Sequence, residues 1–169
     1  CDGWEWRDRR IGAYGHGDKG AGLALMLRQW SADVALFTHA GELTREHRER
    51  LARFDIAVHE QRIARLEGDD HGHVQCIVLA DGATIERDAL FFNTGQHQRS
   101  ALAEKLGCEF TERGGVQTHE HEVATCVPGL YVAGDASRDV QLVIVAVAEG
   151  TKAGFAINKA LLAEDGLAM

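Results

Sequence analysis

The stretch RIGAYGHGDKG, residues 10–20, decides the fold of this chain. Its first five residues, 10–14, are mostly apolar and predict a short buried strand. Glycines at positions 15, 17 and 20 follow at once. Residues 21–30 are apolar nearly all round, which predicts a helix that is buried on several sides. The stretch therefore predicts a strand and a helix joined by a glycine-rich turn.

The segments that follow extend the same alternation of strands and helices. Residues 33–37 and 56–58 are apolar and predict strands, whereas the highly charged residues 44–54 predict a solvated helix. The order strand, helix, strand, helix, strand is typical of a parallel sheet with crossover helices. We therefore expect an α/β fold with a Rossmann-like parallel sheet.

The pattern changes after residue 60. Residues 62–67 and 74–79 predict antiparallel strands, and Asp81-Gly82 is a strong hairpin signal before a further strand at 84–87. We expect these strands to form an antiparallel β-ribbon inserted into the α/β domain. The rest of the chain predicts a buried strand at 89–92, a short helix at 100–106, a polar strand at 116–122 and a buried strand at 130–133. A long helical segment follows at 140–163 and is interrupted by Gly150 and Gly154.

The composition is that of a globular protein rather than a disordered chain, with 45% hydrophobic and 26% charged residues. The net charge of −8 argues against a nucleic-acid-binding face, which needs clustered Lys and Arg. The longest apolar run, residues 140–148, is too short to span a membrane, and no basic leader opens the sequence, so we expect neither a membrane segment nor a secretory signal. The four cysteines are scattered without a CxxC pair, which is typical of reduced thiols in a cytoplasmic protein.

The pattern Gly15-x-Gly17-x-x-Gly20 is a candidate phosphate-binding turn. In such a turn the first glycine permits a tight bend, the second lets the backbone approach a pyrophosphate, and the third lets the helix pack on the strand. The helix N-terminus then offers N–H groups and positive potential to the anion. We therefore predict a nucleotide site that includes His16 and Asp18, with His16 either contacting a phosphate or simply exposed. The alternative is a glycine turn that only joins the strand to the helix.

The end of the second strand bears on the choice of nucleotide. About 20 residues beyond the turn, Asp or Glu holds an adenosine ribose, whereas Arg accommodates a 2′-phosphate. Residues 38–42 are Thr-His-Ala-Gly-Glu and satisfy neither rule cleanly. Glu42 is a candidate for the ribose and His39 for a phosphate, and each is equally well explained as a solvated loop residue. The sequence leaves NADH and NADPH open.

Three separated stretches carry a resemblance to a known family. The chain opens with Cys1-Asp2-Gly3, the glycine turn follows after a short distance, and residues 125–135 are TCVPGLYVAGD. These stretches resemble the C-x-x-C-D-G redox motif, the nucleotide turn and the T-x-x-P-G-hydrophobic-x-A-G-D flavin segment of the thioredoxin reductase family of pyridine nucleotide–disulfide oxidoreductases. Residues 91–95, FFNTG, are similar to the family's second glycine-ended strand.

The resemblance implies roles for individual residues. Asp135 would hydrogen-bond the ribityl chain of FAD, and Gly134 would keep the backbone close to it. Gly95 would end the strand that joins the nicotinamide domain back to the flavin domain, and Cys1 would be the redox-active, catalytic cysteine. The start of the following helix would face the isoalloxazine ring: Gln141, Leu142 and Val143.

The resemblance also implies how the intact protein is organised. Residues 1–122 are expected to form the NAD(P)-binding domain, and residues 123–169 the closing segment of a FAD-binding domain. The expected cofactors are FAD and NAD(P)H, with hydride transfer from the nicotinamide to the flavin and electron passage to a disulfide. The resemblance further implies a cytoplasmic homodimer whose partner is a thioredoxin-like protein or a small disulfide.

The sequence departs from the family pattern at three points. The sequence does not match the second cysteine of the redox pair or the N-terminal flavin half with its own glycine-rich turn. It also does not match the family's basic residues for a 2′-phosphate at positions 38–40. We therefore expect either a portion of a longer enzyme or a truncated relative. Two other interpretations stay open: a ferredoxin- or flavodoxin-type flavoprotein reductase that uses no dithiol, and a nucleotide-binding or regulatory module without catalysis.

Two histidine pairs, at positions 71 and 73 and at positions 119 and 121, raise the question of a metal site. Such spacings can bind zinc, but a site needs further ligands in a fixed geometry. We expect solvated surface histidines and no metal. The cysteines at 76, 108 and 126 are expected to pack as small hydrophobic residues.

Overall fold

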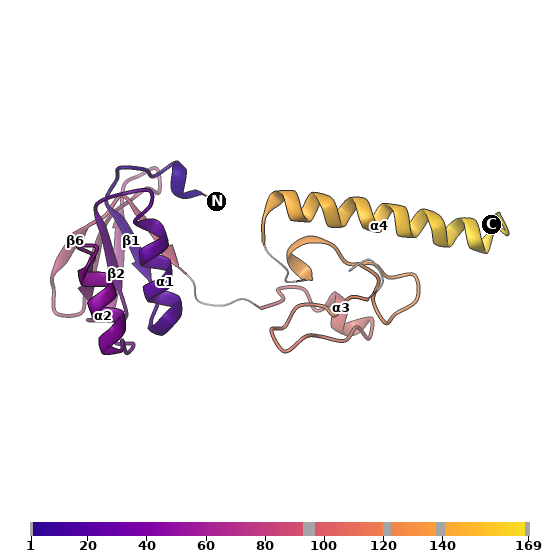
Figure 1. Cartoon of the computed structure of the whole chain (residues 1–169), viewed down its shortest axis with the longest axis horizontal. Coiled ribbons are helices and arrows are strands. Elements are labelled where there is room, and N and C mark those ends of the chain that lie inside the picture. Colours follow the sequence, from indigo (N-terminus) through magenta and orange to yellow (C-terminus); the bar gives the residue numbers. More distant parts are fainter. Residues whose placement is uncertain (1, 93–96, 120–122, 138–140, 168–169) are drawn as a thin grey trace. The chain divides into compact units, whose positions relative to one another are not determined.

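The computed structural model describes residues 2–92, 97–119, 123–137 and 141–167. The chain divides into two compact units, a first unit of residues 1–95 and a second unit of residues 96–169 (Figure 1).

A four-stranded parallel sheet forms the centre of the first unit. Its strands follow the order β3-β2-β1-β7, and each neighbouring pair is parallel. The predicted α/β fold with a Rossmann-like sheet is therefore confirmed. The strands and the two helices that connect them are β1 (Ile11–Tyr14), α1 (Gly17–Leu27), β2 (Val34–Phe37), α2 (Arg45–Ala52), β3 (Ala57–His59) and β7 (Ala89–Phe92).

A three-stranded antiparallel sheet makes up the rest of the first unit, with the strand order β4-β5-β6. This sheet confirms the β-ribbon that the sequence predicts. The strands are β4 (Ile63–Gly68), β5 (Val74–Leu79) and β6 (Thr84–Glu86).

Both faces of the parallel sheet are buried, which explains why its strands are apolar without alternation. Val34 and Leu36 of β2 belong to the core formed with α1 and α2, whereas Ala35 and Phe37 belong to a second core with Ile77 and Leu79 of β5. Successive side chains of a strand point to opposite faces, so β2 supplies both cores. The helices and the antiparallel sheet therefore cover opposite faces of the parallel sheet.

An ion pair joins the starts of β1 and β7. The backbone N–H of Arg10 donates to Asp88 Oδ2 at 2.9 Å, and the Arg10 guanidinium lies 2.7 Å from Asp88 Oδ1. These hydrogen bonds lower the pKa of Asp88. Asp88 N–H in turn donates to Arg10 O at 2.8 Å. Two segments far apart in the sequence are thus joined at the start of their strands.

The second unit contains little regular structure before its last helix. Its elements are α3 (Leu102–Lys105), the 3-10 helix η3 (Gly134–Ala136) and α4 (Val143–Glu164). The strands predicted at 116–122 and 130–133 are wrong for the described residues, because Val116 and Tyr131 each form an isolated bridge instead of a ladder. The long helix is present, and it runs without a break through Gly150 and Gly154.

The division between the units lies at 95/96, whereas the sequence suggested a boundary at 122/123. Residues beyond 96 pack with the later segment: Val116 N–H and Gln98 Nε2 both donate to Ala136 O, at 2.9 Å each. The assignment of the two parts to nicotinamide and flavin binding stays a prediction.

The first unit also contains a short 3-10 helix, η1 (Asp2–Trp4).

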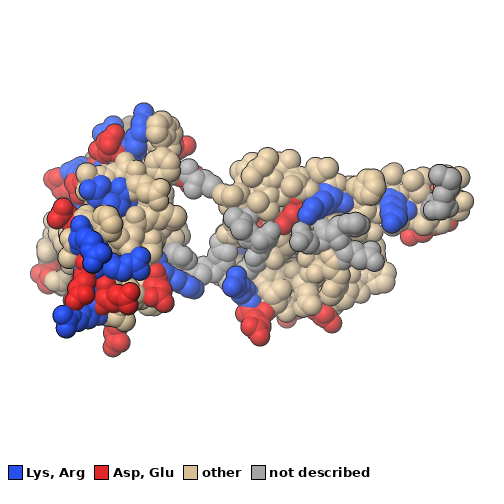
Figure 2. All heavy atoms as spheres, in the orientation of Figure 1, with Lys and Arg blue, Asp and Glu red and all other residues tan. Residues whose placement is uncertain are grey.

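The surface of α4 is unusually apolar. Val143 is 82% exposed and Phe155 is 68% exposed. Figure 2 shows charged side chains of both signs crowded over the first unit and sparse along α4. No helix among the described residues is long and apolar enough to cross a membrane.

We predict that Gly20→Ala destabilises the protein, because a Cβ at Gly20 would lie 2.3 Å from the carbonyl carbon and oxygen of Gly15. Overpacking of this kind typically costs about 1–3 kcal/mol. Gly22→Ala is the matched control in the same helix, since a Cβ there meets nothing within 4 Å, and it should stabilise by about 0.5–1 kcal/mol. Urea unfolding measures both changes, and equal effects from the two variants would contradict the packing argument.

We also predict that the protein becomes less stable as the pH is lowered, because of His59. This residue ends β3 and stacks on Phe37, with ring centroids 4.9 Å apart. Burial lowers the pKa of His59, and the charge of Arg87 lowers it further. Because the unfolded chain then binds the proton more readily, this contribution is complete above the unfolded pKa of about 6.5 and is lost as the pH falls below it.

The measurement is the free energy of unfolding at about pH 7.5 and about pH 5.5. The loss between these values should be smaller in His59→Phe, which keeps the ring stack, than in the wild type. His71→Phe, at the exposed hairpin tip, should behave as the wild type. An identical loss in all three proteins would show that His59 is not the responsible group.

Candidate functional site

The glycine turn lies at the carboxyl end of β1 and leads directly into α1. Gly15 N–H donates to Phe37 O at 3.1 Å, which ties the turn to the end of β2. Gly17 has a φ of 55°, a left-handed conformation that favours glycine. A Cβ at Gly17 would meet nothing within 4 Å, so the space beside this residue is open, whereas Gly20 packs tightly on Gly15. The role of the three glycines in binding a nucleotide stays a prediction.

Two backbone N–H groups at the start of α1 are available to an anion. Gly17 N–H donates to Glu42 O at 3.1 Å and is therefore occupied. Among the described residues, no acceptor is bonded to the N–H groups of Asp18 and Lys19. Unpaired N–H groups in the first turn of a helix are the groups that bind phosphate in nucleotide sites.

The side chains of the turn differ in what they contact. His16 is exposed, and its Cβ lies against Gly41, where an added Cβ would come within 2.3 Å of it. Asp18 Oδ1 lies 2.7 Å from Nε2 of His47. His47 belongs to the capping box of α2 with Thr44. Asp18 therefore links the starts of α1 and α2, in addition to lying at the predicted site.

The loop after β2 carries Glu42, the candidate for the ribose, and His39, the candidate for a phosphate. Nδ1 of His39 accepts a hydrogen bond from Ile63 N–H at 3.0 Å, so this nitrogen already has a partner within the first unit. His39 also makes an edge contact with Tyr14, with ring centroids 5.8 Å apart. Glu42 is exposed, and its carbonyl oxygen is fixed to Gly17 of the turn. The loop thus places a carboxylate, rather than a cation, beside the glycine turn.

Cations near this loop are engaged elsewhere. Arg45 pairs with Glu49 at 2.7 Å, and Arg48 pairs with Glu60 at 2.6 Å. The hydrogen bond from Arg48 lowers the pKa of Glu60, although both groups are largely exposed and the pair contributes little to stability.

A pocket of about 430 Å³ in the second unit brings two of the predicted flavin residues together. Asp135 and Gln141 both line it. Gly134 starts η3 with a φ of 76°, Leu142 is the N-cap of α4, and Val143 is the first residue of that helix. The sequence reasoning missed the other side chains around this pocket: His97, Gln98, Arg99, Ser100 and Ala136.

Gln98 organises one wall of this pocket. Its Nε2 donates to Ala136 O at 2.9 Å and to Gly114 O at 3.2 Å. Gln98 also lines a second pocket of about 310 Å³, which is mostly apolar and is bordered by Leu102, Leu106 and Leu130. A polar residue in a loop of unremarkable composition gives no sequence signal, so the role of Gln98 is visible only in the structure.

Two of the predicted site residues, Cys1 and Gly95, lie outside the described residues. For Cys76, burial raises the pKa of the thiol, and the hydrogen bond to Glu67 raises it further. A raised pKa disfavours the reactive thiolate.

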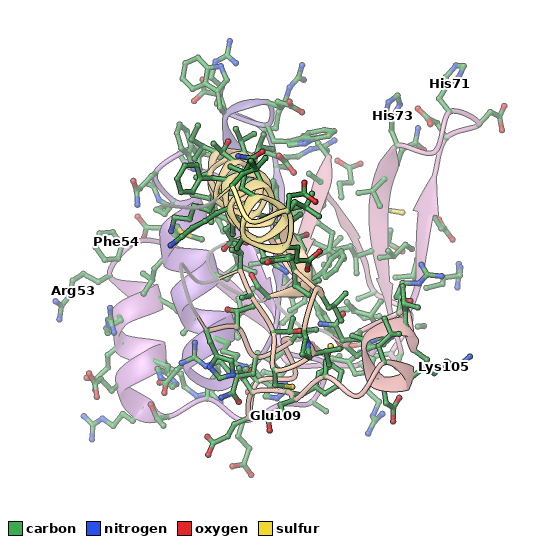
Figure 3. All side chains as sticks on the ribbon, turned by 90° about the vertical axis from the view of Figure 1, so that its right-hand side faces the viewer. Arg53, Phe54, His71, His73, Lys105 and Glu109 are labelled. Atoms are coloured by element: carbon green, nitrogen blue, oxygen red, sulfur yellow. The ribbon has the colours of Figure 1, made fainter. Side chains whose placement is uncertain are left out.

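No group of three or more potential metal ligands occurs among the described residues. His71 and His73 lie at the outer end of the β4–β5 hairpin, as Figure 3 shows, and their ring centroids are 6.3 Å apart. The Asp69 carboxylate accepts hydrogen bonds from the backbone N–H groups of both histidines, and these bonds lower its pKa. Asp69 therefore has a structural role in this turn.

The chain matches known proteins over most of its length. The family model for pyridine nucleotide-disulphide oxidoreductases matches residues 4–150. A glutamate synthase [NADPH] small chain from Mycobacterium tuberculosis (strain CDC 1551 / Oshkosh) is 40% identical over 70 residues, which cover 41% of this chain and 14% of that relative.

Two solved structures share the fold. The crystal structure of HlmI has a TM-score of 0.84 and 33% identity, over 98% of this chain and 51% of that chain. A protein assigned as the thioredoxin reductase TrxB of Bacillus anthracis has a TM-score of 0.86 and 26% identity, over 98% of this chain and 55% of that chain. The chain spans about half the length of these structures. It belongs to the pyridine nucleotide-disulphide oxidoreductase family and is thioredoxin reductase-like.

Proposed function

We propose that this chain supplies the nicotinamide-binding unit and the C-terminal part of the flavin-binding unit of a FAD-dependent, NAD(P)H-using disulfide oxidoreductase. The observation that carries the proposal is the pocket that Asp135 and Gln141 line together, downstream of a glycine turn that is followed by the unpaired N–H groups of Asp18 and Lys19. Membership of the family makes these two nucleotide sites the expected pair.

The first unit would bind the coenzyme through its pyrophosphate. The unpaired N–H groups of Asp18 and Lys19 can donate to phosphate oxygens, and the open space beside Gly17 lets the phosphates approach the backbone. The charge of Lys19 lies at the same helix start and favours an anion there.

Glu42 supports NADH as the coenzyme. A carboxylate at the end of the second strand accepts hydrogen bonds from the ribose hydroxyls, and it repels a 2′-phosphate. Arg45 and Arg48 of α2 pair with Glu49 and Glu60 instead.

The second unit would hold the flavin. Asp135 can accept hydrogen bonds from sugar hydroxyls, and Arg99, the one arginine lining the described part of this pocket, can donate to phosphate or ring oxygens. Bound FAD would supply the two-electron chemistry, with hydride taken from the nicotinamide and electrons passed to a disulfide. The protein's share is to position the ring and to set its electrostatic surroundings.

The acceptor is proposed from family membership and from Cys1. With a partner cysteine, Cys1 would form the dithiol that reduces a thioredoxin-like protein or a small disulfide, in a cytoplasmic homodimer. The name of the Mycobacterium tuberculosis relative, a glutamate synthase small chain, favours a second candidate: a flavoprotein of the same fold that passes electrons to an acceptor other than a dithiol.

We predict that Asp135→Ala weakens FAD binding about tenfold or more, since a hydrogen bond to a charged group contributes about 1.5–3 kcal/mol. The measurement is titration of the apoprotein, prepared from the complete gene, with FAD while flavin fluorescence is followed. The affinity for NADH should not change. Glu109→Ala is the control, because Glu109 is exposed and lies outside the pocket. A wild-type protein that binds no flavin would refute the proposed function.

We predict that Glu42→Gln reduces the preference for NADH over NADPH by about tenfold, because the variant lacks the charge that repels a 2′-phosphate. The ratio of the two dissociation constants is the quantity to measure. Glu46→Gln, in the first turn of α2, is the matched control. An unchanged ratio in Glu42→Gln would rule out Glu42 as the residue that sets the coenzyme preference.

A further inference from the structure

The burial along α4 is the reverse of what an amphipathic helix shows. Its apolar residues are exposed, including Val143, Ile144 and Phe155. The only buried residue of this helix, which the structure describes in full, is Glu149, with 5% of its surface exposed. A buried carboxylate is unfavourable unless hydrogen bonds satisfy it, so its partners indicate what it is for.

Glu149 is hydrogen-bonded to the turn that carries Asp135. Its Oε2 accepts from Gly134 N–H at 2.5 Å and lies 3.1 Å from Ser137 Oγ. The hydroxyl of Ser137 also lies 2.8 Å from Gly134 O. The carboxylate thus contacts both ends of the turn formed by residues 134–137.

The contacts of Gly134 explain why an acceptor is needed at position 149. With a φ of 76°, Gly134 adopts a conformation that few other residues tolerate. An added Cβ would lie 3.5 Å from Cβ of Ala146, so α4 packs directly over this residue. Gly134 is partly buried beneath the helix, and Glu149 supplies the acceptor for its N–H.

The turn is held from its other side by Gln98, which donates to Ala136 O at 2.9 Å. Asp135 lies between the two clamps, and it lines the pocket that also includes Gln141. Residues from two segments, one before the turn in the sequence and one after it, therefore fix the position of one backbone turn.

We propose that Glu149 is a positioning residue for the flavin site. By accepting the Gly134 N–H and contacting Ser137, it holds the turn in the conformation that presents Asp135 to the sugar hydroxyls of the flavin. This inference rests on the proposed function of the pocket. It assigns Glu149 no contact with the flavin, and it requires the acceptor oxygen rather than the negative charge.

The test compares three variants in the full-length protein: Glu149→Ala, Glu149→Gln and the control Glu164→Ala, at the exposed end of the same helix. Glu149→Ala should weaken FAD binding about tenfold or more, because it leaves Gly134 N–H unsatisfied. Glu149→Gln should stay within about threefold of the wild type, since its amide oxygen still accepts that hydrogen bond. Glu164→Ala should bind FAD as the wild type does.

Two further readouts separate positioning from a general loss of structure. The visible absorption bands of the bound flavin should shift in Glu149→Ala and not in Glu149→Gln. The melting temperature of the apoprotein shows whether either variant is merely unfolded. Should Glu149→Ala fail to fold, Ser137→Ala decides instead: it removes one contact of the same carboxylate and should weaken FAD binding about threefold in a folded protein.

The outcomes distinguish this inference from the proposed function. If the wild type binds no FAD, the proposed function fails and the inference fails with it. If the wild type binds FAD, and a folded Glu149→Ala binds it with unchanged affinity and spectrum, only the inference is overturned. Equal losses in the Ala and Gln variants would also overturn it, because the charge rather than the acceptor would then matter.

Discussion

The contact between Gly20 and Gly15 is the constraint on which the first unit depends. The backbone of α1 comes so close to the turn after β1 that a Cβ at Gly20 would lie 2.3 Å from the Gly15 carbonyl. This approach lets Ala21 and Ala24 pack into the core with Ile11 and Ala13 of β1. It also sets the helix start beside the carboxyl end of the sheet, where its unpaired N–H groups would face an anion in the proposed nucleotide site. The packing of the first unit and the proposed binding thus depend on the same two glycines.

The second unit is held together in a different way. In the first unit, apolar residues from helices and from both sheets form two cores. In the second unit, the apolar side chains of α4 are exposed, and polar groups such as Gln98 and Glu149 tie the loops together. Exposed apolar surface of this extent is typical of a face that packs against more protein. The chain spans about half of the solved structures it resembles.

The sequence predicts the first unit well because the forces that shape it are local. The strand from 10 to 14, the glycine turn and the helix after it lie within 20 residues, and each has its own pattern of apolar residues. The antiparallel strands follow from turn residues such as Asp81 and Gly82. The segments at 116–122 and 130–133 have strand-like composition, but a strand also needs a partner, and each forms a single bridge among the described residues. Composition alone does not supply that information.

The candidate site residues also differ in whether the sequence alone reveals them. Gly15, Gly17 and Gly20 could be found from their spacing, and the resemblance brought in Asp135 and Gln141, which the structure places at one pocket. Glu149 could not be found in this way, because a glutamate within an apolar segment has the signal of a solvated residue.

Its burial becomes visible only when Gly134, 15 residues earlier, is placed beneath the helix. A partly buried glycine N–H is best satisfied by an acceptor within the protein, and that acceptor must come from the segment that packs on it. Here that segment is α4, so the helix that would face the flavin also fixes the turn that would bind its sugar. A shift of α4 would therefore disturb both contacts together.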